Sequence, residues 1–90
     1  MGGVGSGVRK NKWHYSRRLE FLRQHLRANG FLDSTNPWMR TYYKTHMNVR
    51  TIQLARDMDE LVDEGFADKE FFVTETYPGR RAIRITKVNW

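Results

Sequence analysis

Residues 49–66 read VRTIQLARDMDELVDEGF. At about 100° per residue its large apolar side chains fall on one stripe, which consists of Leu54, Met58, Leu61 and Val62. Asn48 is a favourable N-cap, and Gly65 accepts the left-handed conformation in which many helices end. The stretch therefore predicts an amphipathic helix from about Val49 to Glu64.

Two runs with strand character follow this helix. Residues 71–76 (FFVTET) and 81–88 (RAIRITKV) are rich in β-branched and aromatic residues, and the second run alternates apolar with polar positions. The sequence YPGR at 77–80 has proline and glycine where a β-turn favours them. We expect a two-stranded hairpin whose loop presents Arg80 and Arg81.

Two further helices are predicted upstream. Ser16 and Gly30 are favourable caps for a helix over residues 16–29, whose apolar stripe is Tyr15, Leu19, Leu22 and Leu26. Asn36-Pro37 is a typical start for a second helix. We assign one face of that helix to the core, and this face consists of Trp38, Met39, Tyr42, Tyr43 and His46. Phe31-Leu32, between the two helices, is either a short strand or a packing turn.

Residues 1–14 are interpreted as a flexible basic arm, and residues 15–90 as one folded domain. Glycine occupies positions 2, 3, 5 and 7, and ordering so many glycines costs much backbone entropy. Three cations follow them, namely Arg9, Lys10 and Lys12. A chain of 90 residues is long enough for one modest hydrophobic core.

The positive charge is concentrated in the first half of the chain. The net charge is +6, with ten basic against two acidic residues in 1–50 and six against eight in 51–90. From Asp57 to Glu70 there are seven acids and one lysine. A basic surface of this kind favours a polyanionic partner, above all nucleic acid.

The order of the predicted elements resembles the winged helix-turn-helix family. Residues 56–66 are similar to its recognition-helix pattern, R-x-L-x-x-L-x-x-x-G-L, and residues 70–86 are similar to its wing. We therefore expect an α+β winged helix-turn-helix fold, with three helices followed by a two-stranded β-hairpin wing. The resemblance implies that the third helix enters a major groove of DNA and that the wing contacts the backbone or the minor groove.

Nine residues are candidates for contact with DNA. The third helix and its start offer Arg50, Ile52, Gln53 and Arg56 to base edges, since arginine pairs with guanine and glutamine with adenine. The wing offers Arg80 and Arg81 to phosphate, and the arm adds Arg9, Lys10 and Lys12. Two alternatives stay open: Arg56 pairs with Glu60 one turn along the helix, and Ile52 packs on the second helix.

The function that these residues predict is sequence-specific binding of double-stranded DNA by a small transcription regulator. Such domains often act as homodimers, and Phe21 or the C-terminal Trp90 is a candidate dimer contact. Two rival functions remain. The acidic surface from Asp57 to Glu70 would suit a module that binds a protein such as a polymerase or nuclease. The tryptophan, tyrosine and arginine residues in the first 43 positions would suit RNA.

Other function classes have little support in the sequence. The chain has no cysteine, no Gly-rich loop leading into Lys-Ser/Thr, and three histidines that are far apart in sequence. We expect no enzymatic activity, cofactor, metal or small-molecule substrate. No apolar run is long enough to span a bilayer, so we expect a cytoplasmic protein with no membrane partner.

Overall fold

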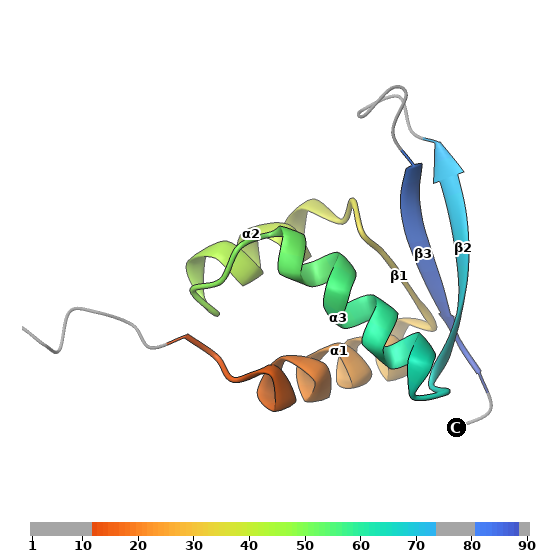
Figure 1. Cartoon of the computed structure of the whole chain (residues 1–90), viewed down its shortest axis with the longest axis horizontal. Helices are drawn as coiled ribbons and strands as arrows, with labels where there is room; N and C mark the ends of the chain where they lie inside the picture. The colour runs from red at the N-terminus through yellow and green to blue at the C-terminus, as the bar shows by residue number, and fades with distance from the viewer. Residues whose placement is uncertain (1–11, 74–80, 89–90) are drawn as a thin grey trace, which may run out of the picture.

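The computed structural model describes residues 12–73 and 81–88. Three helices lie on one side of a small sheet (Figure 1). The elements in chain order are α1 (Tyr15–Asn29), β1 (Phe31–Asp33), α2 (Pro37–Thr45), α3 (Ile52–Asp63), β2 (Ala67–Val73) and β3 (Arg81–Lys87). The fold class is α+β, as the sequence predicts.

The sheet has three antiparallel strands in the order β1-β3-β2, so the prediction of a two-stranded hairpin is wrong in the strand count. Gly30 has a φ of 84°, which turns the chain directly from α1 into β1. Leu32 of β1 then pairs with Ile85 of β3. Both side chains are fully buried, and burying them stabilises a strand too short to be recognised by its own pattern.

The second strand begins earlier than predicted. Ala67 pairs with Lys87 and Glu70 with Arg84, so β2 includes the charged segment before Phe71. Ala67 is buried, whereas Asp68 and Lys69 are exposed on the strand. Charged residues are compatible with this strand because it lies at the edge of the sheet.

The helix starts differ from the predicted caps in two of three cases. His14, not Ser16, caps α1, and its ring accepts from the backbone N–H of Ser16. Asn36 caps α2 as expected. Helix α3 starts at Ile52 after Thr51, because Asn48 has a left-handed φ of 58° and the N–H of Val49 bonds to the carbonyl of Tyr43.

The core lies where α1, α2, α3 and the inner face of the sheet meet. Its largest fully buried side chains include Leu22, Leu26, Leu54, Met58 and Leu61, which confirms the leucine and methionine positions of the stripes predicted for α1 and α3. Tyr15, assigned to the α1 stripe, is instead 56% exposed, and Val62 is only partly buried. The assignment of the whole aromatic face of α2 to the core is wrong. Met39 and Tyr43 are buried, but Trp38 is 57% exposed and His46 is also exposed.

None of the helices in residues 12–73 and 81–88 has the length and apolar character that crossing a membrane requires.

Candidate nucleic-acid interface

A basic hollow of about 750 Å³ lies at the junction of α2 and α3. Its described lining contains four cations and no acid: Lys12, Arg40, Lys44 and Arg50, together with Asn48, Val49, Thr51 and Ile52. The N-terminus of α3 borders this hollow, and the helix dipole adds partial positive charge there. The hollow therefore has positive charge, which attracts phosphate groups.

The turn between α2 and α3 brings these cations together. Met47 is fully buried and anchors the turn, while Asn48 reverses the chain in the left-handed conformation. Arg40 and Lys44 are one turn apart on α2 and line the same side of the hollow. Arg50 comes from the turn itself, two residues before α3 begins.

Lys12 reaches the hollow because the next residue is held on both sides. The backbone N–H of Trp13 donates to the carbonyl of Met47 at 3.0 Å, and Arg18 donates to the carbonyl of Trp13 at 2.8 Å. The Trp13 ring packs edge-on against Phe21 and Tyr42. The chain before α1 is thus fixed against the α2–α3 turn from Lys12 onward.

The first turns of α3 expose two of the predicted base-contacting residues and leave a third partly buried. Ile52 is 58% exposed, and Arg56, one turn further, is exposed as well. Ile52 therefore does not pack into the core, and within the described residues Arg56 forms no ion pair with Glu60. Gln53 is only partly accessible, because its amide points inward to Asp57 at 3.2 Å.

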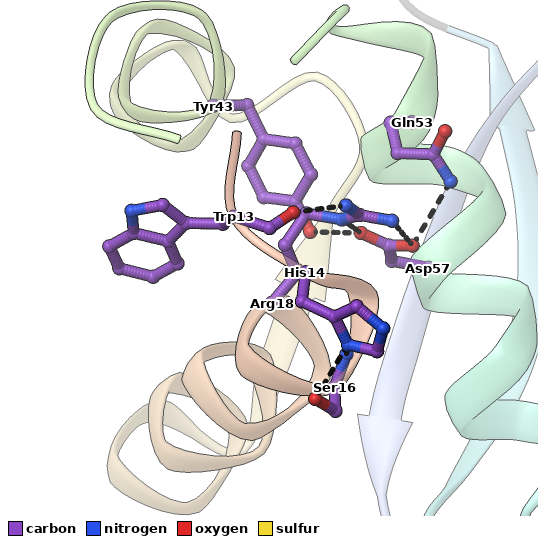
Figure 2. A network of polar contacts seen from close by, with 7 residues as sticks. All are labelled: Trp13, His14, Ser16, Arg18, Tyr43, Gln53 and Asp57. Carbon is purple, nitrogen blue, oxygen red and sulfur yellow. Dashed lines mark hydrogen bonds and ion pairs between the residues drawn. The ribbon is translucent and has the colours of Figure 1, made fainter. Parts of the chain in front are cut away.

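A buried polar network joins all three helices at this point (Figure 2). Asp57 of α3 forms an ion pair with Arg18 of α1, with 2.8 Å between Oδ2 and Nε. Tyr43 of α2 donates its hydroxyl to the same oxygen at 2.7 Å. Only 8% of Arg18 and 4% of Asp57 is exposed, so the pair is an internal crosslink and not part of a charged surface.

The network is fully hydrogen-bonded, as a buried charge requires. No buried side-chain nitrogen or oxygen in the described residues lacks a partner. Burial and the neighbouring Asp57 carboxylate raise the pKa of Tyr43 well above its ordinary value. The Tyr43 phenol therefore remains a neutral donor to Asp57 at any physiological pH.

The surface expected from Asp57 to Glu70 carries less unpaired negative charge than the sequence suggests. Asp57 is internal, which corrects its assignment to that surface. Asp59 pairs with Lys69 at 2.8 Å, and Glu64 pairs with Arg23 of α1 at 3.4 Å. Asp59 and Glu64 thus have cations of the same domain beside them, so less negative charge is left for a basic protein partner.

Aromatic rings from α1 and α2 stack on the surface beside Trp13. Phe21 and Trp38 both lie nearly parallel to Tyr42, at 4.7 and 5.1 Å between centroids. His25 and His46 extend the stack at its two ends. Partial burial lowers the pKa of His25. Phe21, a candidate dimer contact, is already packed within its own domain.

Four of the nine predicted site residues cannot be placed. Arg9, Lys10 and Arg80 lie outside the described residues, as does the side chain of Arg81, whose backbone begins β3. Trp90, the other candidate dimer contact, also lies outside them. Of the remaining five, Lys12, Arg50 and Ile52 line the hollow. Gln53 and Arg56 follow on α3.

Sequence reasoning missed Arg40 and Lys44, although their spacing of four residues on the predicted second helix was a usable signal. It also missed the Arg18–Asp57 pair, for which the sequence offers no local signal.

No group of three or more metal-binding side chains converges within the part of the chain that the structure describes. His14 caps α1, and the other two histidines stack on aromatic rings. What the described residues offer chemically is the positive charge of the hollow.

Comparison of the chain with protein-family models, with curated protein sequences and with solved structures gave no match.

Proposed function

We propose that this protein binds double-stranded DNA in a sequence-specific manner, as a small transcription regulator with a winged helix-turn-helix arrangement. One observation carries the proposal: four cations surround the N-terminus of a helix whose next turns expose Ile52 and Arg56. Phosphate contacts position a protein on DNA, and side chains on base edges give specificity. The two kinds of residue are adjacent here.

In this proposal α3 is the recognition helix, and the hollow holds the backbone of one strand. Lys12, Lys44 and Arg50 bind phosphate, with Arg40 beside them. The β2–β3 ladder extends beyond the helices (Figure 1). The connection between these strands is the proposed wing, and it brings Arg80 and Arg81 to the flanking backbone or minor groove.

Binding of duplex DNA over a salt series tests the proposal. Fluorescence anisotropy with a labelled random-sequence duplex should give an affinity that falls by roughly 10³–10⁵ between about 50 and 200 mM salt, if about 6–10 phosphates are contacted. The hollow variant, Lys44→Ala/Arg50→Ala, should lower the magnitude of the salt slope by about 2. Arg80→Ala/Arg81→Ala should do the same.

The matched control removes two cations from elsewhere. Arg27→Ala/Lys69→Ala changes the net charge equally, but Arg27 lies near the end of α1 and Lys69 on β2. Its slope should stay near that of the wild type. Equal slopes for the control and hollow variants would mean that net charge alone drives binding, and no binding at low salt would contradict the proposal.

A second candidate, single-stranded RNA, is favoured by the exposed Trp38 and the ring stack around it, since bases stack on aromatic side chains. Competition between duplex DNA and single-stranded RNA in the same assay separates the two candidates. Stronger competition by RNA, with a loss on Trp38→Ala, would favour this second function.

A further inference from the structure

The contact between Gln53 and Asp57 determines which groups Gln53 can offer to a partner. Gln53 lies one turn before Asp57 on α3, and its Nε2 donates to Oδ1 of Asp57. Figure 2 shows the amide nitrogen of Gln53 turned toward Asp57 and its oxygen turned away. A side chain expected to read a base is thus also part of the buried network.

The orientation of the Gln53 amide follows from the chemistry of its neighbour. A carboxylate in an ion pair only accepts hydrogen bonds, so it can face the NH₂ end of an amide and not its oxygen. Asp57 is held in place by three donors from other helices: Arg18 Nε, Arg18 Nη2 and the Tyr43 hydroxyl. Because the Asp57 carboxylate cannot rotate, the Gln53 amide must orient its NH₂ group toward it.

Gln53 is left with one free N–H and one carbonyl oxygen. Adenine presents the complement in the major groove, an N7 acceptor beside an N6 donor. Guanine presents two acceptors there, N7 and O6, and would need both N–H groups of Gln53. One of these two groups is already used by Asp57.

We propose that Asp57 is a positioning residue that makes Gln53 select adenine over guanine in duplex DNA. This inference rests on the proposed function and names the base that one residue of the recognition helix reads. Arg18 and Tyr43 act through Asp57, by holding its carboxylate. A bidentate contact of this kind gives roughly 5- to 150-fold discrimination.

Asp57→Asn keeps the shape of the side chain but changes which hydrogen-bonding groups Gln53 can present to a base. The Oδ2 position receives the two short bonds, at 2.8 and 2.7 Å, so the amide oxygen of asparagine takes that position. Its NH₂ group takes the place of Oδ1, so the long contact from Arg18 Nη2 at 3.5 Å is lost. The same NH₂ group then faces Gln53, whose oxygen must turn inward to accept. Both N–H groups of Gln53 now point outward, which is the pattern that guanine requires.

Selection from a duplex library randomised over the whole footprint tests the proposal. We expect wild type to enrich adenine at one position, Gln53→Ala to lose that enrichment, and Asp57→Asn to enrich guanine there. The matched control is Asp59→Asn, an acid on the same helix whose ion-pair partner among the described residues is Lys69, and it should keep adenine. A thermal melt first establishes that each variant is folded.

The outcomes separate this inference from the proposed function. Duplex binding by wild type with adenine still enriched by a folded Asp57→Asn would overturn the role of Asp57 alone. No duplex binding by wild type would overturn both proposals. If Asp57→Asn does not fold, the wild-type comparison still decides, because a Gln53-dependent preference for guanine contradicts the geometry.

A measurement without DNA checks the contact itself. The chain has two glutamines, Gln24 and Gln53, so their side-chain NH₂ signals are easily assigned by ¹⁵N NMR. Gln24 is exposed and bonds to Glu20 on the surface of α1. The Gln53 NH₂ group should be more rigid than that of Gln24 in the free protein. Equal mobility would mean that Asp57 does not fix the amide.

Discussion

The buried network around Asp57 and the basic hollow beside it differ in whether their charges are paired inside the protein or exposed to solvent. In the network one carboxylate receives donors from three helices, and almost none of it reaches solvent. In the hollow, Lys44 and Arg50 are exposed, and the described lining contains no acid. The two regions are adjacent along α3, yet one crosslinks the fold and the other presents charge to a partner.

The polar residues that maintain the fold are those whose charges are buried. A buried ion pair that loses one member leaves an uncompensated charge in a low-dielectric interior. When a surface cation is removed, water fills its place, and the repulsion among the neighbouring cations decreases. Variants in the network should therefore change stability, whereas variants in the hollow should change binding.

The largest expected effect is that of Asp57→Ala. It leaves Arg18 buried without its partner, so the free energy of unfolding should fall by about 3–5 kcal/mol. Urea denaturation followed by circular dichroism measures the loss. Asp59→Ala is the control, because its pair with Lys69 is partly exposed and should contribute about 0–1 kcal/mol. Equal losses in the two variants would contradict the distinction between buried and surface charge.

A smaller effect is expected from Tyr43→Phe. This variant keeps the ring in the core and removes one hydrogen bond to a charged group, which should cost about 2 kcal/mol. The same urea titration measures it. Tyr42→Phe, on the stacked and partly exposed ring next to it, should change stability by less than about 0.5 kcal/mol. An unchanged free energy of unfolding in Tyr43→Phe would mean that Arg18 and Gln53 satisfy the carboxylate without the hydroxyl.

The smallest expected effect on stability is that of the hollow variant, Lys44→Ala/Arg50→Ala. Its free energy of unfolding should stay within about 0.5 kcal/mol of wild type. At low salt the variant should be slightly more stable than wild type, because the hollow then has two like charges in place of four. Thermal unfolding at two salt concentrations measures both. A loss above about 1 kcal/mol would show that the hollow is part of the fold.

Much of the fold was predictable because its signals are local. Gly30 and Asn36-Pro37 mark helix boundaries through backbone conformation, which depends on neighbours in sequence. The stripe of α3 follows from its own periodicity. By contrast, β1 is three residues long and is stabilised by pairing with β3, more than fifty residues later, so no local pattern distinguishes it from a turn.

In the candidate site, too, some features follow from local sequence and others from tertiary packing. The excess of cations in the first half of the chain, the helix that carries Gln53 and Arg56, and the order of the three helices and the last two strands all follow from the sequence alone. That Asp57 is buried, and that four cations line one hollow, follows from tertiary packing; these cations are Lys12, Arg40, Lys44 and Arg50. Periodicity can assign a residue to a helix face, but whether a charge on that face is buried depends on a partner such as Arg18, which is 39 positions away in sequence.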